Sequence, residues 1–202
     1  MLLGKIAEAA RAGVDWIQVR EKDLGGRELS ALVQDALRCA KASTRKKLKG
    51  TQRGGRILVN DRLDVALATR AGGVQLGEKS FPPQEARRLV RALHREKDFL
   101  IGVSCHSLEA AKKAEQAGAD YIFFGPVFAT PSKAAFGAPQ GLERLAEVCR
   151  AVSIPVLAIG GVTLENSAAC LSAGVSGIAA IRLFQDAEDM TAVVRALRKN
   201  KT

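Results

Sequence analysis

The chain lacks the features that mark membrane, disulfide-bonded and zinc proteins. Its apolar runs are far shorter than the roughly 20 residues of a membrane helix, and its N-terminus has neither the basic nor the apolar region of a signal peptide. The four cysteines are widely separated, with no C-x-x-C pair and no histidine cluster. We therefore expect a cytoplasmic protein without membrane contact, whose cysteines are reduced and mostly buried.

Aromatic residues are also scarce, at 4% of the chain, so few rings are available to stack on nucleic-acid bases. The net charge of +10 would suit a nucleic acid, but the basic residues fall into two groups, at 45–56 and 87–97, and form no continuous stripe. The second group has helical spacing opposite Ala86, Leu89, Val90 and Leu93, which predicts an amphipathic helix with these apolar residues buried. We expect no nucleic-acid partner. The basic balance favours small anionic substrates.

Apolar, β-branched runs alternate with helical patterns along most of the chain, whose length and 47% hydrophobic content suit one domain over residues 1–202. The predicted strands are Val14 to Arg20, Arg56 to Asn60, Gly73 to Leu76, Phe99 to Ser104, Asp120 to Gly125, Pro155 to Gly160 and Gly177 to Ile181. This alternation predicts right-handed βαβ units and a parallel sheet.

A weak internal repeat marks the connections from helix to strand. Its members are Ala12-Gly13, Ala71-Gly72, Ala117-Gly118 and Ala173-Gly174. Glycine after a helix adopts the left-handed conformation without steric strain, and connections of this regularity favour a TIM (β/α)8 barrel over a doubly wound sheet. Only seven strands are predicted, however, and residues 1–13 already have a helical pattern. The predicted fold is an α/β TIM barrel without its first strand, which either precedes residue 1 or leaves an edge for another copy in a homo-oligomer.

The segment Gln18-Val19-Arg20-Glu21-Lys22 follows an apolar run. If the strand continues, Gln18, Arg20 and Lys22 point the same way. Arginine offers a bidentate fork for phosphate oxygens and lysine adds a point charge, so the strand end is suited to clamp a diphosphate. The alternative is an ordinary solvated strand end.

In a barrel, chemistry is found at the carboxyl ends of the strands. Polar and glycine-rich segments lie there in this sequence: Asn60-Asp61, Ser104-Cys105-His106, Gly125 to Lys133, Gly160-Gly161 and Ile181-Arg182. Taken in order from Ala12 to about Phe184, these segments and the Gln18 segment resemble the thiamine phosphate synthase family and the related thiazole tautomerases. The synthases join a pyrimidine methyl diphosphate to a thiazole phosphate.

The resemblance implies a residue set for each substrate. The diphosphate would be bound by the five residues Gln18, Val19, Arg20, Glu21 and Lys22, together with Lys133. Asn60 and Ser104 would hold the pyrimidine substrate, His106 belongs to the substrate-binding set beside them, and Asp61 would bind Mg²⁺. The thiazole phosphate would lie at Thr130, Pro131, Ser132, Gly160, Gly161, Ile181 and Arg182.

The family's mechanism follows from the same resemblance. Departure of diphosphate leaves a pyrimidine-stabilised carbocation, which the thiazole nitrogen captures, so catalysis depends on stabilising the leaving charge and positioning the acceptor. The expected catalytic residues are Arg20, Lys22, Ser104 and Lys133.

The sequence departs from the family pattern at two positions. A second magnesium-binding aspartate would fall at Ser80, so either this hydroxyl or the carboxylate of Glu78 must complete the site, unless Lys79 neutralises part of the diphosphate instead. A metal site with one carboxylate should be weaker than one with two. Arg182 stands where the family usually has serine, and it either binds the thiazole phosphate or faces outward.

Four residues near the strand ends and helix starts have both a functional and a structural interpretation. His106 is either a general acid or base, as in the tautomerase branch, or only a hydrogen-bonded residue. Cys105 has no visible base to activate it as a nucleophile, and Asp64 and Asp120 are expected to cap or bridge elements. The leading hypothesis is a thiamine phosphate synthase; the alternatives are a tautomerase-like isomerase and a phosphate-binding protein that has lost its metal site and its activity.

Overall fold

The computed structural model describes residues 2–44, 55–130 and 138–200. The strands are β1 (Trp16–Val19), β2 (Arg56–Asn60), β3 (Gly73–Leu76), β4 (Leu100–Cys105), β5 (Tyr121–Phe124), β6 (Val156–Ile159) and β7 (Gly177–Ala179). The helices are α1 (Leu2–Ala12), α2 (Gly26–Thr44), α3 (Leu63–Ala68), α4 (Pro83–Ala92), α5 (Leu108–Gln116), α6 (Gly141–Ala151), α7 (Leu164–Ser172), α8 (Arg182–Gln185) and α9 (Met190–Lys199).

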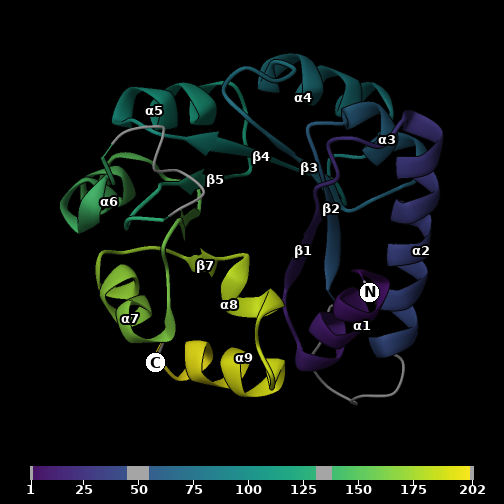
Figure 1. The fold of residues 1–202 in the computed structure, drawn as a ribbon. Coiled ribbons are helices and arrows are strands. Elements are labelled where there is room, and N and C mark those ends of the chain that lie inside the picture. The colour runs from purple at the N-terminus through teal and green to yellow at the C-terminus, as the bar shows by residue number, and fades with distance from the viewer. Residues whose placement is uncertain (1, 45–54, 131–137, 201–202) are drawn as a thin grey trace.

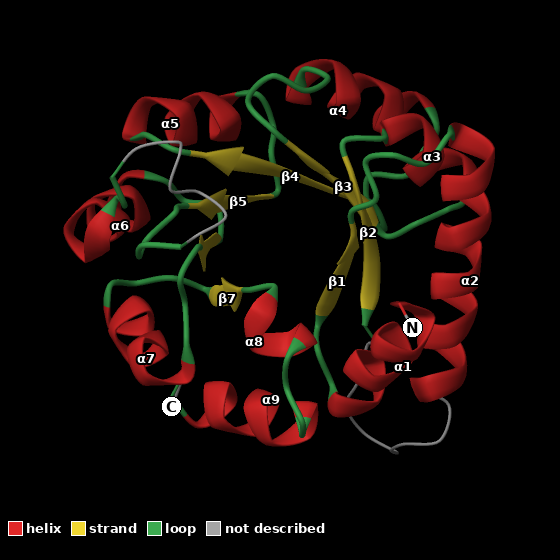
Figure 2. Ribbon diagram, viewed as in Figure 1, coloured by secondary structure: helices red, strands yellow, loops and turns green. Residues whose placement is uncertain are grey.

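The strands form one parallel sheet in the order β1-β2-β3-β4-β5-β6-β7. Figure 1 shows this sheet curved around a centre with helices outside it, and Figure 2 shows the same arrangement by element type. In the described part of the chain β1 and β7 are the two edges, while α1 contacts both α2 and α9, so the ring closes through helices. α8 lies inside the ring, on the side where the sheet is open (Figure 1). The prediction of a TIM-like barrel lacking one strand is confirmed.

Burial follows the position of each strand in the sheet. Every residue of the central strands β3 and β5 is buried, whereas every residue of β7 and three of the four in β1 are only half-buried. The inner core contains Leu58, Tyr121 and Phe123, with Trp16 partly buried against it. An edge strand lacks a neighbour on one side, so its inward side chains stay accessible.

Side chains alternate between the inner core and the surrounding helices, as the period of two requires. In β4, Ile101, Val103 and Cys105 belong to the two clusters packed under the helices. Leu100 packs against the inner core instead. Ser104 lies four residues after Leu100 in β4, so it points to the same inner side of the sheet, near the carboxyl end of the strand.

The glycines of the internal repeat behave as predicted in three of four places. Gly13, Gly118 and Gly174 have φ values of 88°, 86° and 101°. At the remaining repeat Arg70 takes the left-handed conformation, with φ 56°. Gly72 is required for another reason, because a Cβ there would lie 2.2 Å from the side chain of Arg56.

Two strand ends differ from the predictions in ways that affect the site. β1 ends at Val19, so Arg20 and Lys22 lie in the connection to α2, and strand alternation does not determine their directions. β7 ends at Ala179, and Arg182 is the first residue of α8 and not a strand-end residue. Both strands are sheet edges, so their residues form ladder hydrogen bonds on one side only, and the extended backbone is less stabilised there.

The predicted buried face of α4 is correct for Ala86 and Val90 but wrong for Leu89 and Leu93. Leu89 and Leu93 are 45% and 55% exposed, and the helix packs through Ala86 and Val90. Arg87, predicted on the solvent side, is mostly buried, because it finds hydrogen-bond acceptors on the following repeat. Within the described ranges, no helix is both long and apolar enough to cross a membrane.

Candidate functional site

Polar side chains from neighbouring strand ends form a continuous hydrogen-bonded array. Gln18 Nε2 donates to Asn60 Oδ1 over 2.8 Å, and Asn60 Nδ2 donates to Asp61 Oδ2 over 3.0 Å. Asp61 Oδ1 accepts from the Ser80 hydroxyl and from the backbone N–H of Gly77, the latter over 3.3 Å. The array joins the ends of β1 and β2 to the turn after β3. It brings together Gln18, Asn60 and Asp61, as predicted, with Ser80.

The backbone at Asp61 aims its carboxylate out of the strand end. Asp61 has φ 60°, a left-handed conformation that aspartate tolerates better than most residues. Its N–H donates to the Gln75 carbonyl over 2.9 Å, which holds the turn against β3. The carboxylate is exposed to solvent and remains accessible to a cation or a ligand.

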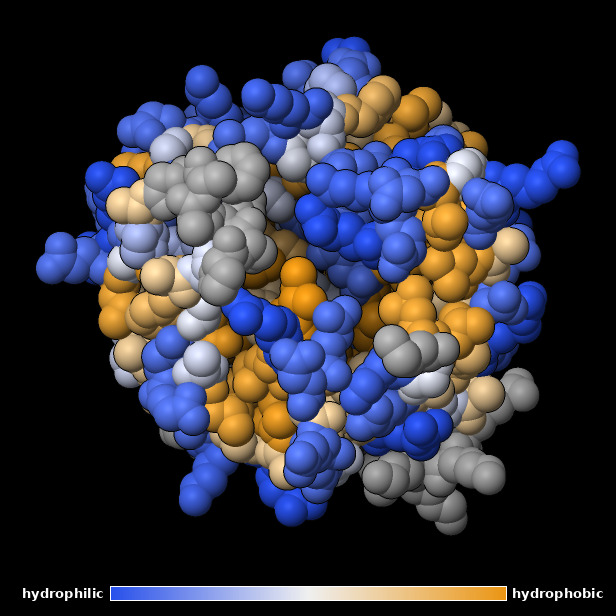
Figure 3. Space-filling view, in the orientation of Figure 1, coloured by the Kyte–Doolittle hydropathy of each residue, from blue (hydrophilic) through white to orange (hydrophobic). Residues whose placement is uncertain are grey.

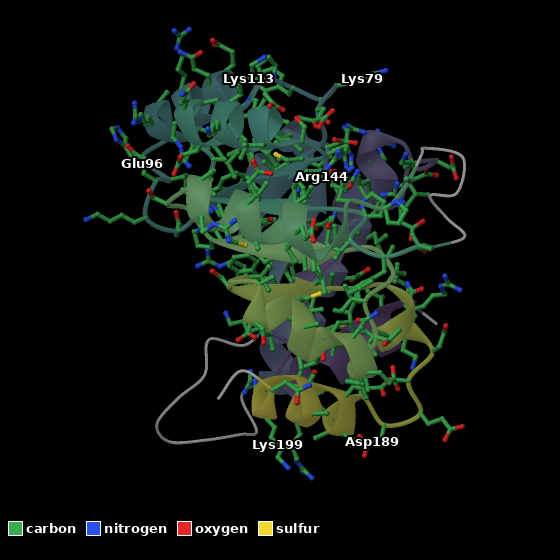
Figure 4. All side chains as sticks on the ribbon, turned by 90° about the vertical axis from the view of Figure 1, so that its left-hand side faces the viewer. Lys79, Glu96, Lys113, Arg144, Asp189 and Lys199 are labelled. Atoms are coloured by element: carbon green, nitrogen blue, oxygen red, sulfur yellow. The ribbon has the colours of Figure 1, made fainter. Side chains whose placement is uncertain are left out.

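Glu78, one alternative for the second magnesium ligand, is bonded to the backbone of His106. Its Oε1 accepts from the backbone N–H of His106 over 3.1 Å, which links the turn after β3 to the end of β4. Lys79 extends away from the body of the protein (Figure 4). Among the three residues after Gly77, Ser80 is therefore the one in contact with Asp61.

A second polar pair lies one strand further along and deeper in the barrel. Gln75 Nε2, from β3, donates to Ser104 Oγ over 3.0 Å. Gln75 is 2% exposed, and its Oε1 has no hydrogen-bond partner among the described residues. Gln75 was not predicted from the sequence, where its signal is a single amide in the otherwise apolar run Val74-Gln75-Leu76.

His106 is exposed, and its Nδ1 contacts the carbonyl oxygen of Gly125. Because a carbonyl only accepts, this contact requires the proton on Nδ1, and Nε2 is then the unprotonated atom of the neutral ring. The neighbouring Cys105 faces the helices and is fully buried. Burial, and then the charge of Glu78, raise the pKa of its thiol to about 12, which is opposite to the activation that a nucleophile needs.

The predicted thiazole phosphate residues are partly brought together. Arg182 Nη2 donates to Thr130 Oγ1 over 3.4 Å, which joins the start of α8 to the segment that follows β5. Ile181 is 54% exposed beside them. Pro131, Ser132 and Lys133 lie outside the described residues.

Gly160 and Gly161, at the end of β6, have φ values of 93° and 68°. A Cβ on Gly160 would lie 2.6 Å from Pro126 Cα, and one on Gly161 would lie 2.7 Å from the Ala129 carbonyl oxygen. Close approach of the segment after β5 thus explains both glycines without a ligand. Their binding of phosphate through backbone amides stays a prediction.

The remaining described diphosphate residues follow Gln18 directly in the chain. Arg20, Glu21 and Lys22 are all exposed after Val19, which is buried under the helices. Figure 3 shows the face of the molecule seen in Figure 1, with apolar side chains in the recessed centre and hydrophilic side chains around it. Arg20 and Lys22 add exposed positive charge at the carboxyl end of β1, which suits an anionic ligand.

Of the two aspartates predicted to be structural, Asp120 bridges two elements and Asp64 makes a local pair at the start of α3. Asp120 Oδ2 pairs with Arg87 of α4 over 2.7 Å and accepts from the Ile101 N–H over 2.7 Å. Asp64 receives two hydrogen bonds from the Arg62 guanidinium, of 2.9 and 2.7 Å. The hydrogen bonds from Arg62 hold the pKa of the Asp64 carboxyl below its ordinary value.

Comparisons with known proteins agree with this geometry. The family model described as thiamine monophosphate synthase matches residues 1–184. The chain is 44% identical over 195 residues to the thiamine-phosphate synthase of Methanocella arvoryzae, covering 96% of this chain and 85% of that protein. It is 43% identical over 190 residues to that of Methanoculleus marisnigri, covering 94% and 83%.

Solved structures extend the agreement to three dimensions. Thiamine phosphate pyrophosphorylase from Pyrococcus furiosus superposes with a TM-score of 0.81 and 34% identity, covering 98% of this chain and 88% of that one. A 3-hexulose-6-phosphate synthase, at 17% identity and a TM-score of 0.65, shares the fold alone. The family model covers most of the chain, the relatives are more than 40% identical, and the solved structure superposes closely. The chain therefore belongs to the thiamine monophosphate synthase family.

Proposed function

We propose that the protein is a transferase that joins 4-amino-2-methyl-5-(diphosphomethyl)pyrimidine to thiazole phosphate, giving thiamine phosphate and diphosphate. The observation that carries the proposal is the hydrogen-bonded array Gln18–Asn60–Asp61–Ser80, located where the resemblance expects the pyrimidine diphosphate. Family membership over residues 1–184 supports the same reaction.

The reaction breaks the bond between the pyrimidine methylene carbon and the diphosphate oxygen, and it forms a bond from that carbon to the thiazole nitrogen. The electron pair of the broken bond leaves with diphosphate, so charge builds up on the leaving group. Arg20 and Lys22, exposed at the end of β1, and Lys133 would stabilise that charge. The amides of Gln18 and Asn60 orient one another and would position the pyrimidine substrate.

Mg²⁺ fits this strand end as a site with one carboxylate. No group of three or more histidine, cysteine, aspartate or glutamate side chains able to hold a metal occurs in the described ranges. The exposed Asp61 carboxylate and the Ser80 hydroxyl are hard oxygen donors in contact with each other, and Mg²⁺ commonly takes one or two carboxylates with the rest from water and phosphate. Asp61 and Ser80 would hold the ion, and its charge would offset that of the diphosphate.

The test is turnover of the two substrates with and without Mg²⁺, with thiamine phosphate detected by mass spectrometry. Asp61→Asn should lower Mg²⁺-dependent turnover by about tenfold or more, because it removes the charged ligand. Asp64→Asn is the matched control three residues away, since that carboxylate is paired with Arg62, and it should stay within about twofold of wild type. Equal losses in both variants would contradict the assignment of Asp61.

Further variants separate the alternative activities and ligands. A synthase loses turnover in Lys133→Ala but not in His106→Ala, whereas a tautomerase-like isomerase shows the reverse. No product from folded protein would favour a phosphate-binding protein without turnover. If Glu78→Ala leaves the dependence on magnesium concentration unchanged, Glu78 is not a ligand. A cytoplasmic location and a homo-oligomer remain predictions.

A further inference from the structure

The inner core contains two polar atoms that have no hydrogen-bond partner among the described residues, and they are neighbours. They are Gln75 Oε1 and the Tyr121 hydroxyl oxygen, on side chains that are 2% and 0% exposed. Both atoms lie 2.4 Å from the position that a Cβ would take on Gly102. Buried polar atoms are rarely left unpaired, so two adjacent ones that complement each other point to an interaction.

We propose that Tyr121 and Gln75 are positioning residues that fix the direction of the hydrogen bond made by Ser104. The proposed chain needs one hydrogen bond beyond those of the described geometry, from the Tyr121 hydroxyl to Gln75 Oε1, which a small shift of either side chain would form. Gln75 Nε2 donates to Ser104 Oγ, and the Ser104 hydroxyl is left to donate to the substrate. This inference rests on the proposed function, in which Ser104 contacts the pyrimidine substrate. The inference means that the substrate atom bonded to Ser104 is a hydrogen-bond acceptor, such as an unprotonated ring nitrogen.

The reverse direction is unfavourable for a reason that depends on the burial of Tyr121. If the Gln75 amide turned over, Ser104 would donate to Oε1 and Nε2 would donate to the tyrosine oxygen. The tyrosine proton would then need another acceptor, yet its ring is enclosed by Trp16 and Phe123, at centroid distances of 4.6 and 5.5 Å. A buried donor without an acceptor is penalised, so the forward direction is preferred.

Gly102 makes the arrangement possible. It is the inward residue of β4 between Leu100 and Ser104, and it leaves room for the tyrosine hydroxyl and the glutamine oxygen to approach each other. Any side chain there would separate them. The three residues Gln75, Gly102 and Tyr121 come from three adjacent strands, β3, β4 and β5.

The first experiment is a double-mutant cycle on KM for the pyrimidine diphosphate. Tyr121→Phe should raise KM about threefold to tenfold, the effect of one hydrogen bond, with a smaller change in kcat. In a Ser104→Ala background the same substitution should change KM by less than twofold, because the proton it directs is gone. An equal rise in both backgrounds would overturn the proposal. Phe123→Leu disturbs the same core without a polar group, and it should not show this dependence on Ser104.

A second cycle uses thermal unfolding and needs no substrate. Gln75→Met and Tyr121→Phe should each lower Tm by roughly 2–4 °C, because each leaves one polar atom without its partner. The double variant should be less destabilised than the two single variants added together. Additive losses would overturn the pairing. If the wild type shows no turnover, the proposed function fails while this cycle still tests the pairing of Gln75 with Tyr121.

Discussion

The substitution Gly102→Ala is predicted to destabilise the protein because the inner core has no space for one more carbon. The added Cβ would lie 2.1 Å from Tyr121 Cζ and 2.4 Å from both the tyrosine hydroxyl oxygen and Gln75 Oε1. Ordinary carbon contacts lie at about 3.5–4.0 Å, so the ring would have to move by more than 1 Å. Tyr121 is fully buried against Trp16 and Phe123 and has no free direction in which to move.

The size of the effect follows from the stiffness of the site. Forcing an extra methyl group into a packed core lowers stability by about 1–3 kcal/mol, and a rigid aromatic ring that must shift places Gly102→Ala near the upper end. For a chain of this size 1 kcal/mol moves Tm by roughly 2–4 °C. A loss of about 3 kcal/mol, at roughly 2–4 °C for each kcal/mol, gives an expected fall in Tm of about 6–12 °C.

The matched control is Gly177→Ala, which adds the same methyl group to another inward glycine of the sheet. Its Cβ would meet the Leu157 side chain at 3.7 Å, an ordinary van der Waals contact. Because alanine also restricts the unfolded chain, this variant should be neutral or more stable by up to about 1 kcal/mol. Both free energies of unfolding are measured by urea titration. Values for the two variants within about 0.5 kcal/mol of each other would refute the packing argument.

Three further predictions concern charge and reactivity. Ser80→Asp places a second carboxylate against Asp61, so Tm should fall without Mg²⁺ and rise more steeply than in wild type as Mg²⁺ is added; an unchanged response would argue against a metal site there. Asp120→Asn should lower the free energy of unfolding by about 1.5–3 kcal/mol, since the carboxylate accepts two charge-assisted or backbone hydrogen bonds. Asp98→Asn, in a pair whose carboxylate is 63% exposed, should cost less than about 1 kcal/mol by the same titration. Cys105, whose pKa is raised to about 12, should resist iodoacetamide at pH 8 in the folded protein, and fast labelling seen by peptide mass spectrometry would contradict its buried, protonated state.

The order and type of the elements were predictable because each depends on a local pattern. β2 and β3 have the predicted bounds, and the helix predicted over residues 1–13 is α1. The ends of β1 and β7 were predicted too long, because an edge strand is held by one neighbour and its last residues follow the next connection. The buried face of α4 was predicted only in part for a related reason: Arg87 is buried by acceptors that only the fold brings to it.

The candidate site divides in the same way. Gln18, Asn60, Asp61 and Ser104 were predicted from strand-end positions and from the family resemblance, and they face the carboxyl end of the barrel. Ser80 was one of the two residues considered for completing a metal site with Asp61, and it is the one in contact with Asp61. The support of Ser104 by Gln75 was not predicted. These contacts join residues 19 and 29 positions apart in the chain.

The sequence by itself determined the alternating strands and helices, the seven-strand count, the turns at Gly13, Gly118 and Gly174, and the family. These properties depend on periodicity, on single-residue backbone preferences and on motif order, all of which are local in the chain. Only the tertiary structure decided which polar groups meet. Strand register and the close approach at Gly102 place Gln75, Ser104 and Tyr121 in one buried group, and hydrogen bonds depend on ångström-scale distances that no linear pattern specifies.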